Sequence, residues 1–242
     1  MKSNLFNLLR TSVLLTSIGA MGATYAAVTL DRTRIIFDGD QQSINITIRN
    51  DNPELPYLAQ SWLEDASEKK LEAGPIIATP PIQRMEPKST SLVRLSTAPD
   101  ISKLPQDRES LFYYNLREIP PKSTEAGVLQ IALQSRVKLF YRPEAIVADS
   151  KKEWAKQVTL TPTANGYQLN NPTSFYLTVI GIGNSQKQSE QSDFDAVMVP
   201  PKSTHNLKSA KFATPYLTYI NDYGGKPSLA FKCQASQCTV TP

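Results

Sequence analysis

Short runs of alternating apolar and polar residues recur along the chain and predict β-strands. Such runs occur at 43–50 (SINITIRN), 91–96 (SLVRLS) and 111–119 (LFYYNLREI). Every second side chain of a strand faces the same side, so each run offers one apolar face to a core. Turn residues separate the runs, among them Asp38-Gly39, Gly74-Pro75 and Gly224-Gly225. No stretch has a convincing amphipathic helical period, and we expect at most single turns at 62–71 and 149–157. With 18 prolines in the chain, this pattern predicts an all-β fold built from sandwiches.

The run GVLQIALQSRVKLFYRP at 127–143 is longer than a common strand. At period two, its apolar face carries Leu129, Ile131, Leu133, Val137, Leu139 and Tyr141, and its polar face Gln130, Gln134, Arg136 and Lys138. As one strand, residues 129–141 would extend roughly 40 Å, about twice a common length. Such a strand either crosses a large sheet or leaves an apolar edge that invites pairing with another chain. The pattern alone leaves both interpretations open.

The first 26 residues have the features of a secretory signal. Lys2 and Arg10 flank a start without acidic residues, a short apolar segment covers 11–23, and small residues stand at 24 and 26. We therefore expect cleavage between Ala26 and Ala27. The apolar segment is shorter than the ~20 residues of a membrane span, so the expected product is an exported, soluble protein without a membrane span.

Removal of residues 1–26 would lower the formal net charge from +4 to +2, because the segment contains Lys2 and Arg10 and no acidic residue. So small a balance gives no ground for binding to nucleic acid or to a membrane surface. The remaining 216 residues suit two domains of about 100 residues each. A polar stretch near 142–152 marks the boundary, which predicts domains at 27–146 and 147–242.

Trp62, in the strand-like run YLAQSW, is placed like the core tryptophan of an immunoglobulin-type sandwich. The first predicted domain has no cysteine, so it lacks the usual disulfide between the two sheets. The only cysteines are Cys233 and Cys238. In an exported protein, this pair predicts a disulfide that closes a hairpin, and so short a loop stabilises only modestly.

The chain lacks the residue patterns of an enzyme. His205 is the only histidine, and it stands in a polar run where we expect it to be exposed. A GxSxG elbow, a P-loop and a Rossmann glycine pattern are all absent from the sequence. A metal site at Cys233 and Cys238 is not expected, because His205 is distant and no other thiol exists. We therefore predict no enzyme, no cofactor and no metal.

One motif indicates a family. The segment LPQDRESLFYYNLREIP at 104–120 resembles, along its whole length, the signature of periplasmic pilus-assembly chaperones. Further blocks agree with this resemblance: 27–39 (AVTLDRTRIIFDG), 50–62 (NDNPELPYLAQSW), 77–87 (IATPPIQRMEP), 170–173 (NNPT) and 214–225 (TPYLTYINDYGG). The resemblance covers essentially the whole chain after residue 26.

The resemblance implies two immunoglobulin-like β-sandwich domains in a boomerang arrangement with a cleft between them. It implies a chaperone that binds pilin subunits by donor-strand complementation and delivers them to an outer-membrane usher. Leu129, Ile131 and Leu133 match the residues that a long donor strand inserts into the pilin groove. Arg34 and Lys138 match the pair that binds the C-terminal carboxylate of the pilin.

Glu109, Arg142 and Asp222 match a third set of family positions, which form an ion network between the domains. The short connection at 120–127 resembles the subgroup that assembles rod-like pili. The resemblance leaves self-association of the free chaperone open. The alternative function is an exported adhesive or ligand-binding module built from two immunoglobulin-like sandwiches, which would present loops in place of a strand edge.

Overall fold

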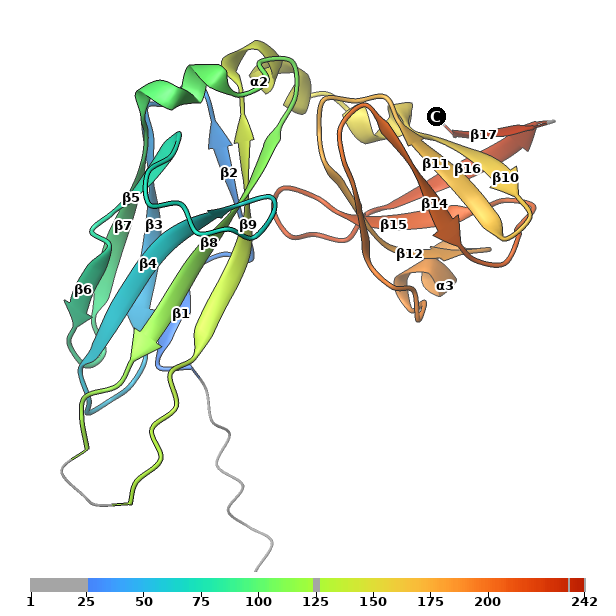
Figure 1. Ribbon diagram of the computed structural model, residues 1–242. Helices are drawn as coiled ribbons and strands as arrows, with labels where there is room; N and C mark the ends of the chain where they lie inside the picture. Colours follow the sequence, from blue (N-terminus) through green and yellow to red (C-terminus); the bar gives the residue numbers. More distant parts are fainter. Residues whose placement is uncertain (1–25, 124–126, 235, 242) are drawn as a thin grey trace, which may run out of the picture.

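The computed structural model describes residues 26–123, 127–234 and 236–241. Residues 1–25, which make up nearly all of the expected signal segment, lie outside the described residues. The chain folds into two β-sandwich domains that are set at an angle to each other (Figure 1). The prediction of an all-β protein with two sandwiches is therefore confirmed.

The first domain consists of two sheets packed face to face. Its strands are β1 (Val28–Leu30), β2 (Arg34–Asp38), β3 (Ser43–Asn50), β4 (Tyr57–Asp65), β5 (Ile76–Thr79), β6 (Ile82–Met85), β7 (Thr90–Thr97), β8 (Ser110–Ile119) and β9 (Gln134–Arg142). One sheet has the order β1-β3-β7-β5 and the other the order β2-β9-β8-β4-β6. All neighbours are antiparallel except β2 and β9, which run parallel. A 3-10 helix, η1 (Pro99–Lys103), precedes β8.

The first strand changes sheets within a few residues. β1 pairs with β3 in one sheet, and after residues 31–33 the chain continues as β2 beside β9 in the other sheet. β2 covers the edge of β9 only from Lys138 to Arg142. The edge of β9 before Lys138 is therefore open on this side.

The second domain contains eight strands in the order β13-β12-β15-β16-β17-β10-β11-β14. Their bounds are β10 (Thr159–Thr163), β11 (Gly166–Asn171), β12 (Leu177–Gly183), β13 (Val197–Val199), β14 (Ser203–Lys208), β15 (Tyr216–Ile220), β16 (Ser228–Gln234) and β17 (Gln237–Val240). β16 joins the two layers, since its first residues pair with β15 and its later residues with β17. Short helical segments among the described residues are α2 (Glu144–Ser150), which follows β9 at the end of the first domain, and η2 (Trp154–Gln157) and α3 (Gln186–Glu190) in the second domain.

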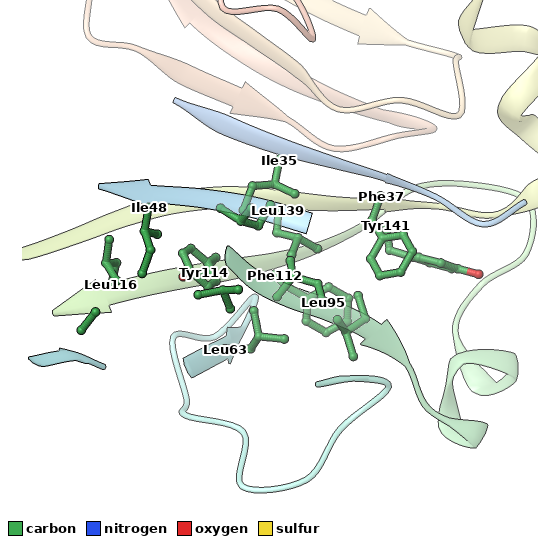
Figure 2. Close-up of a cluster of buried hydrophobic side chains, with 14 of the residues drawn as sticks. Ile35, Phe37, Ile48, Leu63, Leu95, Phe112, Tyr114, Leu116, Leu139 and Tyr141 are labelled. Carbon is green, nitrogen blue, oxygen red and sulfur yellow. The ribbon is translucent and has the colours of Figure 1, made fainter. Parts of the chain in front are cut away.

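Each domain has its own hydrophobic core. Figure 2 shows that β2 and β9 each contribute to the first core, with Ile35 and Phe37 from one strand and Leu139 and Tyr141 from the other. Tyr114 lies at the centre with no exposed surface, and its hydroxyl is 2.8 Å from the Ser61 hydroxyl. The alternation along β9 therefore identifies Leu139 and Tyr141 as core residues, although Phe140 and Arg142 on the opposite face are buried as well.

The prediction that Trp62 is a core residue is wrong. Its neighbours in β4, Ser61 and Leu63, are buried, whereas Trp62 is half-buried on the outer face of the sheet. There the Arg117 guanidinium lies 5.1 Å from the ring centroid, and the indole N–H donates to Glu64 at 3.1 Å. In a strand, alternate residues face opposite sides, so Ser61 and Trp62 cannot both face the core. In β4 the smaller Ser61 faces the core, and Trp62 faces outward.

The expectation of at most single helical turns also needs correction. α2 spans seven residues, Glu144–Ser150, directly after β9, and buries Ile146 and Val147. Two adjacent buried residues in so short a helix give no 3.6-residue period in the sequence. η2, at 154–157, agrees with the single turn expected there.

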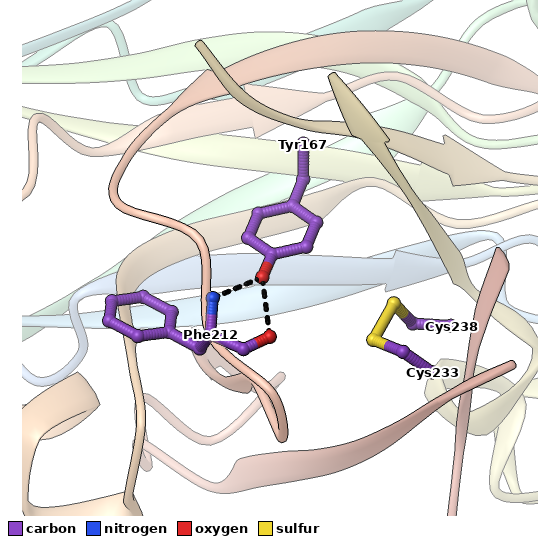
Figure 3. The surroundings of a disulfide bond; sticks show 4 residues. All are labelled: Tyr167, Phe212, Cys233 and Cys238. Carbon is purple, nitrogen blue, oxygen red and sulfur yellow. Dashed lines mark hydrogen bonds between the residues drawn. A yellow bond between two sulfur atoms is a disulfide. The ribbon is translucent and has the colours of Figure 1, made fainter. Parts of the chain in front are cut away.

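The predicted hairpin disulfide is present. Cys233 and Cys238 are directly opposite each other in β16 and β17, with their Cα atoms 3.8 Å apart. Figure 3 places the disulfide near Tyr167, whose hydroxyl accepts a hydrogen bond from the Phe212 N–H at 2.7 Å and donates to the Phe212 carbonyl at 3.0 Å. Cys238 is fully buried in the second core. The disulfide thus joins β16 to a residue of β17 that packs in the core of the second domain.

Candidate functional site

The open edge of β9 is the first feature of the site. β8 pairs with β9 along Gln134–Tyr141, and β2 pairs with it only from Lys138 onward. Residues 134–137 therefore have a neighbouring strand on one side only. Among the described residues, 127–133 have no strand partner, although the Leu133 carbonyl accepts a hydrogen bond from the Glu118 N–H at 3.0 Å.

The predicted thirteen-residue strand is too long for the free chain, because residues 129–133 lie outside β9. β8 ends at Ile119 and is followed by Pro120 and Pro121, which have no N–H to donate. The hydrogen-bonded ladder between β8 and β9 therefore cannot continue to residues 129–132. The Gln130 side chain instead contacts the connection that precedes it, donating to the Pro121 carbonyl and accepting from the Ser123 N–H.

The side chains on the apolar face of this unpaired segment lie in solvent. Leu129 is 84% exposed, Ile131 64% and Leu133 43%. They stand at odd positions, as do Val137 and Leu139 of β9, so an extended chain would carry all five on one face. Large apolar side chains in a row at an open edge are a liability that proteins usually avoid. Their exposure indicates a surface that binds a partner.

Arg34 and Lys138 lie directly opposite each other at the point where β2 begins to cover β9. Both are half-buried, and among the described residues neither forms an ion pair with a carboxylate. Burial lowers the pKa of Arg34, and burial together with the nearby Arg34 charge lowers the pKa of Lys138. Nη1 of Arg34 donates to the Ile220 carbonyl of the second domain at 3.2 Å, whereas its buried Nε has no hydrogen-bond partner in the described part of the chain.

Two hollows lie close to this part of the structure, and Arg34 lines one of them. The cleft between the domains encloses ≈ 660 Å³ and is lined by residues of both domains, including Arg34, Asp222 and Tyr223. A groove of ≈ 400 Å³ lies between the segment 29–33 and the open edge of β9, and is lined by Thr29, Leu30, Arg32, Thr33, Ser135, Arg136 and Val137. Arg32 and Thr33 belong to both hollows, so the groove leads into the cleft.

Arg142, at the end of β9, is the centre of a buried ion network. Its guanidinium lies 2.8 Å from Glu109 and 2.9 Å from Asp222, and a longer contact of 3.6 Å reaches Asp38. The other oxygen of Glu109 accepts a hydrogen bond from the Tyr176 N–H at 2.7 Å. Asp222 and Tyr176 belong to the second domain, so the network joins the two domains.

Burial raises the pKa of Glu109 to about 7, although the Arg142 charge and the Tyr176 N–H oppose that rise. The side chains of Glu109 and Arg142 are each only 3% exposed. A buried network of this kind contributes little net stability, but the loss of one member leaves the others without compensation. Its contacts connect the end of β9 to the second domain.

A second contact between the domains was not predicted from the sequence. The Asp107 carboxylate accepts from the Lys202 ammonium, and the Asp107 carbonyl accepts from the Ser174 hydroxyl at 2.8 Å. The Glu109 N–H donates to the Ser174 carbonyl at 2.9 Å. Asp107 stands in the motif at 104–120, but its partners lie 67 and 95 residues away, and no local pattern connects them.

The structure thus brings the predicted site residues together in two groups. Arg34 and Lys138 form one group, and Glu109, Arg142 and Asp222 form the other, at the far end of the same strand pair. Leu129, Ile131 and Leu133 lie away from both groups along the line of β9. Within the described residues, no cluster of three or more potential metal ligands is found. No helix in this part of the chain is long and apolar enough to cross a membrane.

The fold and the site define a two-domain β-sandwich binding protein with an unpaired apolar segment and two cations that form no ion pair with a carboxylate of the described residues. Comparison with known proteins identifies its family. Residues 27–147 match the family model of the pili and flagellar-assembly chaperone, PapD N-terminal domain, and residues 153–231 match that of the pili assembly chaperone PapD, C-terminal domain. The chain belongs to the family of pilus-assembly chaperones, which confirms the resemblance.

Individual relatives agree with this assignment. The chain is 58% identical over 215 residues to the chaperone protein PapD of Escherichia coli, covering 89% of this chain and 90% of the relative. The crystal structure of the periplasmic chaperone SfaE has a TM-score of 0.69 at 31% identity, covering 84% of this chain and 98% of that one. The structure of the Salmonella enterica SafA pilin in complex with the SafB chaperone has a TM-score of 0.72 at 23% identity, covering 88% and 99%, and supports the fold. The protein is a pilus-assembly chaperone and not an enzyme.

Proposed function

We propose that this chaperone captures a pilin subunit in the periplasm by adding residues 128–137 to the subunit as its missing strand, and then delivers the subunit to an outer-membrane usher. The observation that carries the proposal is the row of exposed side chains at Leu129, Ile131 and Leu133, which continues the line of β9 beyond its last partner. An incomplete sandwich has a complementary groove that can accept every second side chain of an added strand.

The position of β2 defines the direction of the incoming strand. β2 occupies the edge of β9 from Lys138 onward and runs parallel to it. A partner strand with its C-terminus at Arg34 and Lys138 must approach along the open edge from the Leu129 end. It therefore also runs parallel to β9, in line with β2, and lies against the groove formed by Thr29, Leu30, Ser135 and Val137.

The pair Arg34 and Lys138 suits a terminal carboxylate. An arginine fork donates two parallel hydrogen bonds to a carboxylate, and a lysine adds a compact charge. In the free chain the two cations repel each other, and burial disfavours both charges. A bound carboxylate would compensate both effects. It would also fix the register, because a slip of one residue would turn Leu129, Ile131 and Leu133 away from the groove.

The network of Glu109, Arg142 and Asp222 is proposed to hold the angle between the domains, and with it the width of the cleft. Its contacts join the end of β9 to the loop that follows β15. We place the domains at 27–146 and 147–242. Export into the periplasm is proposed to follow from a signal at residues 1–26, with cleavage after Ala26.

The substitution Arg34→Ala tests the carboxylate anchor. We expect it to abolish co-purification of a co-expressed pilin while the far-UV spectrum and thermal unfolding of the chaperone stay unchanged. Arg94→Ala is the matched control. Arg94 is an exposed arginine of β7, in the sheet that does not contain β9, and it donates to the Ser43 hydroxyl of the neighbouring strand β3. An undiminished pilin yield with Arg34→Ala would contradict the anchor.

Modification of the pilin provides an independent test of the same contact. A pilin whose C-terminus is amidated, or extended by a few residues, should lose most of its affinity for the wild-type chaperone. It should lose no further affinity for the Arg34→Ala variant, because the partner of the carboxylate is already absent. Equal binding of the free-acid and amidated pilins to the wild-type chaperone would contradict recognition of the terminus.

A further inference from the structure

Glu118 is a buried carboxylate that neither the anchor nor the ion network uses. It lies near the end of β8, is 5% exposed, and faces the core side of the sheet together with Tyr114 and Leu116. Its Oε2 accepts one hydrogen bond, from the Val28 N–H at 2.7 Å. Among the described residues no lysine or arginine pairs with it. A buried carboxylate with a single backbone donor is unfavourable unless a positive charge lies close to it.

The main chain next to that hydrogen bond is held in place. Ala27 is 7% exposed, and its carbonyl accepts a hydrogen bond from the Asp51 N–H at 2.7 Å. The backbone nitrogens of consecutive residues lie roughly 3–4 Å apart. The nitrogen of Ala27 is therefore one step along the chain from the nitrogen that already contacts Glu118.

We infer that Glu118 binds the α-ammonium group that forms at Ala27 when the signal segment is removed. This inference rests on the proposed export and on cleavage after Ala26. In that hydrolysis a water molecule adds to the Ala26 carbonyl carbon and the bond to the Ala27 nitrogen breaks. Ala26 leaves as a carboxylate, and the nitrogen takes up protons to become an ammonium group. A neutral amide is thereby replaced by a cation beside Glu118.

The other charged groups near Ala27, which are Asp51, Arg49 and Lys88, already have partners. Asp51 pairs with Arg49 at 2.7 Å and accepts from the Thr29 hydroxyl at 3.0 Å. The Lys88 ammonium donates to the Asp51 carbonyl at 2.6 Å. The Asp51–Arg49 pair is largely exposed, with side chains 40% and 59% accessible. Glu118 is the buried acceptor that lacks a cation, so the new ammonium group is directed to it.

Two consequences link this contact to pilin capture. A peptidase cannot bind the Ala26–Ala27 bond while Ala27 is buried, so the bond is cut while β1 is undocked. Docked β1 then supplies Thr29 and Leu30, which form one wall of the groove beside the open edge of β9. The contact between Glu118 and the new terminus would therefore hold in place a strand that lines the pilin-binding groove.

A double-mutant cycle tests the inference. The processed chain that begins at Ala27 is compared with a chain that carries one extra glycine between Ala26 and Ala27, each with Glu118 and with Glu118→Gln. With Glu118, the extra residue displaces the ammonium group, and we expect the folding equilibrium constant from urea unfolding to fall about tenfold or more. With Glu118→Gln, the extra residue should have little effect. Glu72→Gln, at an exposed side chain, is the matched control and should leave the full effect of the glycine in place.

The outcomes separate this inference from the proposed cleavage. Intact mass determines the N-terminus of each exported chain. In the chains without the added glycine, a terminus other than Ala27 would overturn the cleavage site and the inference with it. A terminus at Ala27 with the same effect of glycine in both backgrounds would overturn the inference alone.

A second measurement does not depend on a folded Glu118 variant. The α-amino group of the wild-type processed chain should be reductively methylated at neutral pH at least tenfold more slowly when folded than in urea. Equal rates would show that the group is free in solvent and would contradict its contact with Glu118.

Discussion

The two halves of the segment 128–142 share one alternating pattern and have opposite environments. Leu139 has no exposed surface, because β2 and β8 flank it and the opposite sheet covers it, whereas Leu129 is 84% exposed. The residue types are the same, and the difference lies in the number of neighbouring strands. An alternating pattern therefore defines which side chains share a face, and the pairing of strands decides whether that face is buried within the chain or is left for a partner.

The comparison predicts opposite effects for the same substitution in the two halves. Leu139→Ala removes side-chain atoms from a packed core and should lower the free energy of unfolding by about 2–5 kcal/mol. Leu129→Ala removes atoms that already contact solvent, and should change it by less than about 0.5 kcal/mol. Urea unfolding of both variants measures the difference. A loss of similar size at both positions would mean that residue 129 is packed in the free chain and that the two halves do not differ.

Substitutions in the exposed half should affect pilin binding strongly, although they affect the stability of the free chaperone little. Ile131→Asp places a charge where an apolar side chain enters the pilin groove, so affinity for a pilin should fall more than tenfold, or about 1.4 kcal/mol. The stability of the free chaperone should not change, because Ile131 is 64% exposed. Ile77→Asp, at a 50% exposed isoleucine in β5, is the control and should keep full affinity. Wild-type pilin affinity for Ile131→Asp would exclude residues 128–133 as the donated strand.

The paired half of the segment, residues 134–142, ends at Arg142 in the ion network. This network should make the stability of the folded chaperone depend on pH. Burial raises the pKa of Glu109 from 4.5 to about 7 in the folded chain. Between these two values the folded chain holds a proton that the unfolded chain has released. The contribution of Glu109 to stability is therefore greatest below pH 4.5 and declines as the pH rises to 7, by at most about 1.4 kcal/mol per pH unit.

The difference in unfolding free energy between the wild type and Glu109→Gln, measured across this pH range, isolates that contribution. The exposed Glu54→Gln variant serves as the control for a general change in net charge. A difference between wild type and Glu109→Gln that is independent of pH from 4.5 to 7 would contradict the raised pKa.

Local alternation was enough to predict much of the fold. The runs that became β3, β7 and β8 were recognised from their own residues, and the two cysteines predicted their hairpin. The core position of Trp62 was wrong because composition favours a buried tryptophan, whereas period two puts the neighbouring Ser61 inside. α2 was missed because seven residues are too few for a helical period.

The site was predictable only in part, since its residues come from distant segments. The motif resemblance named Arg34 and Lys138, but their opposition in parallel strands depends on the change of sheet between β1 and β2. The contact of Asp107 with Lys202 joins two turns 95 residues apart, and only the packing of the two domains creates it. The open edge itself could not be read from the pattern, because the pattern continues across the point at which the pairing stops.

The central claim is that residues 128–133 have no strand partner in the free chaperone and form a paired strand in the complex. Amide hydrogen exchange of this segment, measured with and without a bound pilin, tests it most directly. We predict rapid exchange at Leu129 and Ile131 in the free protein and at least a hundredfold slowing in the complex, with little change at the already paired Leu139 and Phe140. Exchange at 128–133 that stays rapid while the pilin is bound would contradict donation of this strand.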